Sequence, residues 1–390
     1  MTTAELKSEV NSQVECQREE LIELSLRIHA NPELGFKEEK ALNWITSYLA
    51  GKGFQIEKGI GSLPTAFKSV YGNGEPVIAL LAEYDALPEV GHACGHNIIA
   101  AAAVGAGVAC KSIIDNCGGT ITIFGTPAEE LFGGKVIMLQ EGLFDGVDVA
   151  MMVHAGTRNR ATIQALACVG LEIEFFGKAA HAAAHPEEGV NALETMILAF
   201  NAINSLRQHI KDNSRVHGII THGGEAANVV PAYSAAKLLV RASNSVYLEE
   251  LKQKVLNCFS GASLATGAQL EYKWGEIVYA PMNNNLTLAR LFSLNLESLG
   301  RKVKPLDDRS GFGSTDMGNI SQIMPAIHPS VAIAEPGISL HSTDFALAAA
   351  SEAGHQGLLD AAKALAMTVA DVLSEPGVLD NVKEEFFRRS

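Results

Sequence analysis

Residues 83–97 read EYDALPEVGHACGHN, and the rest of the chain is organised around this stretch. An apolar, strand-like run at residues 77–82 precedes it, and an alanine-rich, helix-like run from residue 98 follows it. Asp85, Cys94 and His96 therefore lie where a strand ends and a helix begins, the usual ligand-binding crevice of an α/β sheet. A thiolate beside an imidazole suits zinc or a similar divalent ion. Taken alone, however, such a pair is more commonly a buried cysteine beside a capping histidine.

Length and composition restrict the class of protein. The 390 residues are enough for two or three domains, and the 47% of hydrophobic residues allows sizeable cores. The formal net charge of −14 argues against nucleic acid or an anionic membrane as a partner. Six cysteines without a repeating spacing are typical of free thiols in a reducing compartment. Because we find no signal peptide and no apolar run of about 18 residues, we expect a soluble, cytoplasmic protein.

Strand and helix patterns alternate in the first part of the chain. Helices are predicted at residues 5–29, 38–49, 97–114 and 134–140, and strands at residues 54–57, 65–70, 77–82, 120–124 and 149–153. The pattern returns after residue 279, with a helix at 285–299, a strand at 331–334 and a helix at 343–373. The fold class expected is α/β, with a mostly parallel sheet and helices on both faces.

The order of elements changes near residue 170. A strand, a helix, two strands, a helix and a strand are predicted at residues 171–176, 191–208, 218–222, 235–242, 248–263 and 269–274. This is the order of the ferredoxin-like α+β sandwich. We therefore expect an inserted domain at residues 170–278, between two parts of the first domain at residues 1–169 and 279–390.

Further polar side chains follow the predicted strands. Glu129 and Glu130 come just after the strand at 120–124, where one carboxylate could hold a cation and the other could move a proton. The alternative is that these two acidic residues only stabilise the N-terminus of a helix through its dipole, which would give the same sequence pattern. His154 follows the apolar run VAMMV, and His341 lies in the loop PGISLHSTDFA. Each of these histidines could equally be a capping group.

Considered together, five potential metal ligands fall at the carboxyl ends of predicted strands or in the adjoining loops, where parallel sheets bind ligands. They are Cys94, His96, Glu130, His154 and His341. With Glu129 as a spare carboxylate, the set matches a hydrolytic site in which two cations about 3.5–4 Å apart share a water molecule. Glu129 could take the proton of that water and pass it to a leaving amine.

An ordered series of motifs covers nearly the whole chain. The motifs are HANPELGFKEEK, AEYDALP, GHACGHN, GTPAEE, MMVHAG, GKAAHAAAHPEEGVNAL, NVVPAYS, GSTDMGNISQIMPAIHP and LHSTDFA. In this order they resemble the aminoacylase-type branch of the M20 family of metallopeptidases and amidohydrolases. Within it, the chain is most similar to the group of p-aminobenzoyl-glutamate hydrolase and the β-alanyl-dipeptidase-like M20 domain-containing protein 2. The resemblance implies a binuclear metal-dependent amidohydrolase that cleaves small N-acyl or aroyl amino acids or dipeptides.

The resemblance also implies a role for each residue of the metal centre. The five potential ligands would hold two divalent ions, zinc or manganese, with Cys94 at the bridging position. Glu129 would be the general base and acid, and Asp85 would orient the imidazole of a ligand. Glu83 stands where other branches have a ligating histidine, and Asn97 stands where many relatives have an aspartate.

The inserted domain would act as a lid and as a dimerisation domain. His181 would polarise the scissile carbonyl, often from the partner subunit, although an exposed loop histidine is the alternative. Asn228 and Arg241 would hold substrate oxygens, with Arg241 as a clamp for a carboxylate unless it pairs with a local acid. The resemblance thus implies a homodimer that acts on a small molecule with a free carboxylate.

Several expectations remain open at this point. Gly311, Gly313 and Ser314 are expected to shape the substrate pocket through backbone groups. The other histidines are interpreted as structural: His29, His92, His185, His209, His217, His222, His328 and His355. A hydrolase of another C–N bond, or a metal-free binding protein on the same scaffold, remains an alternative function.

Overall fold

The computed structural model describes residues 1–304 and 313–389, which form two compact units. Unit 1 comprises residues 1–164, 282–304 and 315–389. Unit 2 comprises residues 165–281 together with Gly313 and Ser314. The insertion was expected at residues 170–278, so the expected and observed segments differ at both ends by a few residues of strand and linker. Gly311, expected to shape the substrate pocket, lies outside the described residues.

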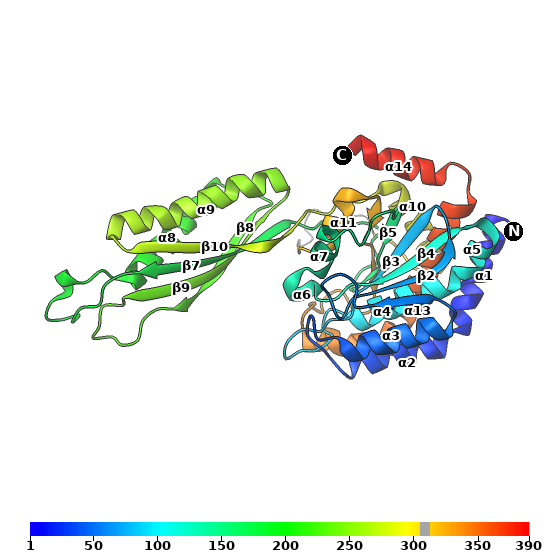
Figure 1. Cartoon of the computed structure of the whole chain (residues 1–390), viewed down its shortest axis with the longest axis horizontal. Helices are drawn as coiled ribbons and strands as arrows, with labels where there is room; N and C mark the ends of the chain where they lie inside the picture. Colours follow the sequence, from blue (N-terminus) through cyan, green and yellow to red (C-terminus); the bar gives the residue numbers. More distant parts are fainter. Residues whose placement is uncertain (305–312, 390) are drawn as a thin grey trace. The chain divides into compact units, whose positions relative to one another are not determined.

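Unit 1 consists of helices packed around a central sheet (Figure 1). Its helices are α1 (Thr3–Cys16), α2 (Arg18–His29), α3 (Glu39–Gly51), α4 (His96–Ala109), α5 (Lys111–Cys117), α6 (Glu129–Phe132), α7 (Gly134–Gln140), α10 (Leu286–Ser298), α11 (Met317–Ile323), α12 (Thr343–Ala349), α13 (Glu352–Ser374) and α14 (Val378–Arg389). Its strands are β1 (Gln55–Lys58), β2 (Phe67–Asn73), β3 (Val77–Ala82), β4 (Gly119–Gly125), β5 (Val149–Met151), β6 (His154–Gly156), β11 (Ala326–Ile327) and β12 (Ser330–Ala332).

The central sheet has six strands in the order β1-β2-β4-β3-β5-β11. Strands β4, β3, β5 and β11 pair in parallel, whereas β1 and β2 form an antiparallel edge. A separate parallel pair joins β12 to β6. The predicted α/β class with a mostly parallel sheet is therefore confirmed.

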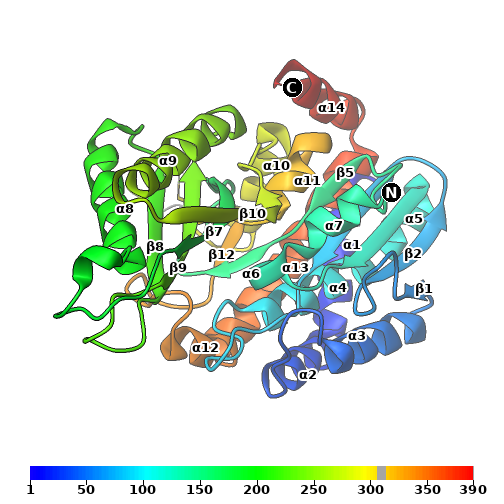
Figure 2. The ribbon, with the colours of Figure 1, turned by 60° about the vertical axis from the view of Figure 1, so that its left-hand side comes forward.

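Strand β3 contributes to a core on each face of the sheet, because successive side chains point to opposite faces. Ile78 and Leu80 belong to the core that includes α4 and α13, whereas Ala79 and Leu81 belong to the core that includes α7 and α11. Helix α4 packs against β3 on one side and against α1, α2 and α13 on the other, and Figure 2 shows α13 alongside it. This double packing explains why α4 is apolar on every side.

The same helical stretch has the length and composition of a membrane span, which was not expected from the sequence. His96–Cys117 covers 22 residues, and 83% of its most apolar window is buried inside the protein. Because buried core helices share these properties, the stretch is weak evidence for a membrane span.

Some predicted boundaries in unit 1 are wrong. The helix predicted at residues 5–29 is interrupted at Gln17, whose side chain accepts a hydrogen bond from the Tyr48 hydroxyl at 2.8 Å. The helix predicted at 343–373 is interrupted before Ser351, which caps α13 by accepting from the Gly354 amide. Helix α14, which packs on α10 and α13, was not predicted. His154 follows β5 as expected, but it also begins a further strand, β6.

Unit 2 has the predicted ferredoxin-like order of elements (Figure 1). They are β7 (Ala167–Phe176), α8 (Ala192–Leu206), β8 (Arg215–His222), β9 (Tyr233–Ala242), α9 (Ser245–Thr266) and β10 (Gln269–Tyr279). The four strands form an antiparallel sheet in the order β10-β7-β9-β8. Helices α8 and α9 cover one face and share a core with alternate residues of β7 and β9.

Candidate metal centre

Five segments of unit 1 supply the predicted metal ligands. Cys94 lies in the loop after β3, and His96 is the first residue of α4. Glu130 lies in the first turn of α6, directly after β4. His154 begins β6, and His341 lies in the loop between β12 and α12. The ligands therefore follow β3, β4, β5 and β12, as expected for a site at the carboxyl edge of parallel strands.

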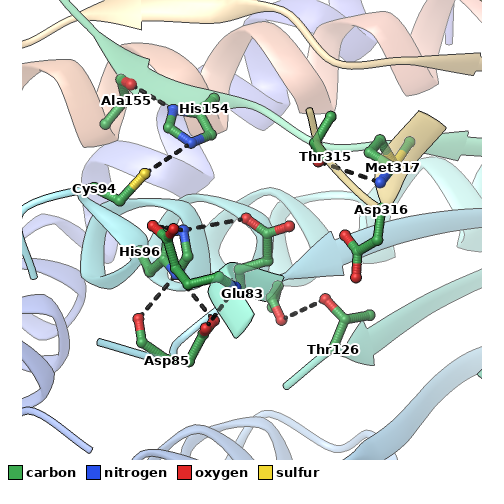
Figure 3. A network of polar contacts seen from close by, with 12 residues as sticks. Glu83, Asp85, Cys94, His96, Thr126, His154, Ala155, Thr315, Asp316 and Met317 are labelled. Carbon is green, nitrogen blue, oxygen red and sulfur yellow. Dashed lines mark hydrogen bonds and ion pairs between the residues drawn. The ribbon is translucent and has the colours of Figure 1, made fainter. Parts of the chain in front are cut away.

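The structure brings these five side chains together in two overlapping triads. Potential ligand atoms of Cys94, His96 and His154 all lie within 4.8 Å of one another, and so do those of Cys94, Glu130 and His341. The Cys94 Sγ lies 3.4 Å from His154 Nε2. Figure 3 marks this contact with a dashed line. Glu130 Oε1 lies 3.3 Å from His341 Nε2 and 3.8 Å from His96 Nε2. Cys94 is common to both triads.

Asp85 orients one residue of each triad, and Figure 3 shows its contact with His96. Its Oδ1 and its backbone oxygen accept hydrogen bonds from His96 Nδ1 at 3.0 and 2.8 Å, which leaves Nε2 directed at the centre. Its Oδ2 accepts from the Glu130 backbone amide at 3.0 Å. Although burial opposes ionisation, the His96 imidazole lowers the pKa of Asp85 below its usual value.

Backbone oxygens orient the other two histidines. His154 Nδ1 donates to the Ala155 oxygen at 2.5 Å, so that Nε2 faces Cys94. His341 has a left-handed backbone with φ of 62°, and its amide donates to the Ala93 oxygen at 2.9 Å. This bond ties the His341 loop to the residue next to Cys94. A left-handed conformation is uncommon outside glycine and is typical of functional loops.

The donor set fits divalent cations. It combines one sulfur, three imidazole nitrogens and a carboxylate, which are the ligand types of zinc sites. His96 Nε2 is buried and has no hydrogen-bond partner among residues 1–304 and 313–389. Burial raises the pKa of the Cys94 thiol well above its usual value, and a bound cation would reverse this shift by stabilising the thiolate.

Glu129 lies beside this donor set. Its side chain is buried, and one of its oxygens lies within 4.8 Å of oxygens of Glu83 and Asp316. Burial, followed by the negative charges of Glu83, Asp316 and Glu130, raises the pKa of Glu129 well above its usual value. Cations held by the neighbouring side chains would oppose this shift, because positive charge stabilises the ionised carboxylate.

Lys135 and Asp316 were not singled out from the sequence. Lys135, on α7, is completely buried, and its Nζ donates to Glu83 and, at 2.7 Å, to Asp316 Oδ1. Burial alone would lower the pKa of Lys135, but the Asp316 and Glu83 carboxylates raise this pKa above its usual value. A lysine in the otherwise apolar helix GKVIMLQ was the available signal for this cluster. Glu83 therefore pairs with a lysine at the position where other branches have a histidine.

Two predicted substrate-contacting residues lie together in unit 2. The Ala182 amide donates to the Asn228 backbone oxygen at 3.0 Å, next to His181. His181 Nδ1 accepts from the Ala183 and Ala184 amides at 3.3 and 3.2 Å. In the neutral ring the proton is therefore on Nε2, which can donate to another group.

A second pair of predicted residues also lies in unit 2. Arg241 donates to the Ser314 hydroxyl at 2.8 Å, and the Leu166 amide donates to the Gly313 oxygen at 2.9 Å. These bonds attach Gly313 to Leu166, the residue before β7, and Ser314 to β9. The five predicted metal ligands all belong to unit 1, whereas these substrate-contacting candidates belong to unit 2.

Comparisons with known proteins agree with this architecture. Residues 168–265 match a family model described as a peptidase dimerisation domain. The chain is 37% identical to an Xaa-Arg dipeptidase from Mus musculus, over 98% of this chain and 92% of the relative. It is 29% identical to one of the subunits of the p-aminobenzoyl-glutamate hydrolase from Escherichia coli K12, over 96% of this chain and 94% of the relative. A Bacillus subtilis protein described as a dinuclear metal binding peptidase shares the fold, with a TM-score of 0.71 and 21% identity over 92% of this chain and 99% of that one.

Proposed function

Because the chain belongs to the M20 family of metal-dependent peptidases and amidohydrolases, we propose that it cleaves an N-acyl or N-aroyl amino acid or a dipeptide with a free carboxylate. Relatives that match nearly its whole length are a dipeptidase and an aroyl-glutamate hydrolase. The chain is therefore a hydrolytic enzyme that acts on amide bonds. The acyl group and the amino acid that it prefers are the questions for experiment.

One observation carries the proposed mechanism, namely the two triads that share Cys94. Cys94, His96 and His154 would hold one divalent ion. Cys94, Glu130 and His341 would hold the other. When bound, the ions would activate a water molecule and polarise the substrate carbonyl. Zinc or manganese would serve, and the sulfur and imidazole donors favour zinc.

The buried Glu129 carboxylate has the role of moving the proton. With cations bound beside it, Glu129 would be ionised, and it would accept a proton from the attacking water and deliver it to the leaving amine. Its place next to Glu130 in the first turn of α6 keeps it beside the metal-binding side chains. Asp85 supports the same arrangement because it binds both His96 and the Glu130 amide.

Unit 2 would bind the substrate. The Nε2–H donor of His181 suits the carbonyl oxygen on which negative charge develops. Asn228 and the Arg241 guanidinium suit the remaining substrate oxygens. Asn228 lies beside His181, whereas Arg241 lies at the opposite end of the β7–β9 pair, where it contacts Ser314 and Gly313 precedes Ser314.

The proposal includes a homodimer in the cytoplasm. The dimerisation-domain match covers β8, an edge strand on which Ile219 is 65% exposed. An exposed apolar edge strand favours association with a second copy. The six free cysteines support a reducing compartment.

A substrate screen tests the function. Protein stripped of metal receives zinc or manganese and is assayed against N-acetyl amino acids, N-aroyl amino acids and β-alanyl dipeptides. We expect turnover of at least one class and no turnover with chelator present. The Glu129→Gln variant should retain its metal and lose about 10²–10⁴-fold in kcat, the usual contribution of a general acid–base group.

Two outcomes would contradict the proposal. Wild-type kcat in Glu129→Gln would remove Glu129 as the base. Absence of turnover on every class, with both ions bound, would reject the substrate class.

A further inference from the structure

Glu38 is a buried carboxylate whose side chain does not cap its own helix. It immediately precedes α3, the place where a polar side chain usually accepts from the first helical amides. Glu33 performs that task instead, because its carboxylate accepts from the Lys40 and Ala41 amides at 2.9 and 3.0 Å. The Glu38 carboxylate is thereby directed into the protein, where it is completely buried.

Both oxygens of this carboxylate bind groups from distant segments. Oε1 accepts from the Ala128 backbone amide at 2.9 Å, and Oε2 accepts from the Thr65 hydroxyl at 2.8 Å. Burial raises the pKa of Glu38 to about 7. Since burying a carboxylate is costly, an apolar side chain at this position would be the cheaper way to fill the space.

Ala128 is the residue that Glu38 holds, and it has an unusual backbone. Its φ of 59° and ψ of 42° lie in the left-handed region of backbone conformations, which residues other than glycine rarely adopt. It directly precedes Glu129 and Glu130, so this turn sets the direction in which both carboxylates leave the chain. Two further bonds hold the same segment, from the Thr126 amide to the Ala82 oxygen and from the Glu130 amide to Asp85.

We propose that Glu38 is a positioning residue, which holds the left-handed turn at Ala128 and thereby presents Glu129 and Glu130 to the metal centre. Its effect on turnover rests on the proposed function, whereas its effect on the turn does not. A buried carboxylate that only stabilises the fold would change stability without changing kcat in the folded enzyme.

A glycine substitution separates these two roles. Glycine adopts the left-handed conformation without cost, so Ala128→Gly should make the turn independent of Glu38. We expect Glu38→Met to lower kcat by tenfold or more while KM changes by less than about twofold. Adding Ala128→Gly to Glu38→Met should restore most of the lost kcat. Glu38→Gln should remain near wild type, because its amide can accept from Ala128 and donate to Thr65.

Glu385→Met is the matched control. The Glu385 carboxylate also accepts from backbone amides, those of Leu286 and Thr287 at 2.8 Å, and from the Thr287 hydroxyl. It belongs to α14, which carries none of the residues assigned to the centre. We expect this variant to have a lower melting temperature and the wild-type kcat.

Two kinetic outcomes would overturn the positioning role. One is an unchanged kcat in Glu38→Met, measured below its melting temperature. The other is a lowered kcat that Ala128→Gly does not raise. If Glu38→Met does not fold, Glu38→Leu replaces it, because leucine also removes the bond from the Ala128 amide, and the same two outcomes apply.

Hydrogen exchange tests the turn without any substrate. In metal-free protein, Glu38→Met should accelerate exchange of the Ala128 amide at least tenfold and leave the Thr287 amide unchanged, whereas Glu385→Met should do the reverse. Equal exchange of the Ala128 amide in Glu38→Met and wild type would reject the positioning role. A wild-type protein that cleaves no substrate would reject the proposed function alone, since the exchange rates still decide the role of Glu38.

Discussion

At the scale of single residues, the position of one sulfur atom has the widest consequence. Two triads share Cys94. Each of the other four predicted ligands belongs to only one of these two triads: His96 and His154 to the first, Glu130 and His341 to the second. Loss of this side chain should therefore disturb both cation sites, and loss of any one of the others should disturb mainly its own.

Cys94→Ala should strongly reduce the metal content of the protein. A binuclear centre holds about two ions per chain, and we expect atomic emission to measure a metal content well below that in the variant. Cys110→Ala is the control, because Cys110 is also buried but lies at the end of α4 among apolar residues. Two ions bound to Cys94→Ala with wild-type affinity would show that the ligands are wrongly assigned.

Because the pKa of Glu38 is raised, we expect the stability of the fold to depend on pH. Its pKa is about 7 in the folded protein, against a usual value of 4.5. A raised pKa means that the folded state binds the proton more tightly than the unfolded state does. The stabilisation is complete below about pH 4.5 and is lost as the pH rises through about 7. The full loss is about 3 kcal/mol of unfolding free energy.

Comparison with Glu38→Gln measures this effect, because glutamine does not titrate. The unfolding free energy of the wild type minus that of the variant should fall between pH 5 and pH 8. Urea unfolding at several pH values gives this difference. A difference that is constant with pH, or that rises, would show that the pKa of Glu38 is not raised.

At the scale of elements, a buried lysine joins two helices to the sheet. Lys135 on α7 binds Glu83, which follows β3, and Asp316, which precedes α11. The Lys135 amide also donates to Asp316 at 2.9 Å. The two acids of this cluster lie within 4.8 Å of Glu129. The lysine thus compensates the charge of acids beside the centre while it fixes the packing of α7 and α11.

Lys135→Met should lower the unfolding free energy of unit 1 by about 3–5 kcal/mol, since it leaves two buried carboxylates without their cation. Trp44 lies in unit 1 and Trp274 in unit 2, and the chain has no other tryptophan. In a Trp274→Phe background, fluorescence during urea unfolding therefore reports on unit 1.

The matched control is Lys52→Met, which removes a half-exposed lysine paired with Glu20 at 2.5 Å. It should change the unfolding free energy by no more than about 1 kcal/mol. Equal effects of Lys135→Met and Lys52→Met would show that the buried cluster is not important for stability.

For some helices and strands, local sequence patterns were sufficient to predict the bounds. The run at 77–82 and the helix at 134–140 were predicted with the bounds of β3 and α7, because apolar runs and glycine boundaries are local signals. The interruption at Gln17 has no glycine or proline to mark it, and the side chain that binds there, Tyr48, is distant in sequence. Helix α14 follows a Pro-Gly turn at residues 376–377, a signal that was present but not used.

At the scale of the whole molecule, the proposed function needs residues from both units. The proposed base Glu129 belongs to unit 1, and the proposed carbonyl-polarising His181 belongs to unit 2. His181 lies within the segment that matches the dimerisation domain. If His181 acts on the site of the partner subunit, each site is complete only in the dimer.

Mixing two inactive variants tests this arrangement. His181→Ala and Glu129→Gln subunits should regain activity together, because one site of each mixed dimer has an intact Glu129 and receives His181 from the partner. Random exchange should give about a quarter of wild-type activity, since half of the dimers are mixed and half of their sites are complete. Steady-state assays of the mixture provide the measurement.

A mixture of Glu129→Gln with Cys94→Ala is the control, because both lesions lie in unit 1 and each damages its own site. It should remain inactive. If differently tagged subunits of the first mixture purify together and no activity returns, action of His181 across the dimer is rejected.

Local sequence patterns were enough to predict the order of most strands and helices, the inserted ferredoxin-like unit and the residue types of the candidate centre. Periodic apolar runs are local, and the carboxyl ends of parallel strands lie at one edge of a sheet, so Cys94, His96 and Glu130 could be expected near one another. Two contacts could not be predicted in this way, namely the position of Lys135 between Glu83 and Asp316 and the bond from the Ala128 amide to Glu38. These contacts join segments far apart in the chain, and they form because buried polar groups must find partners within the packed core, which no local pattern records.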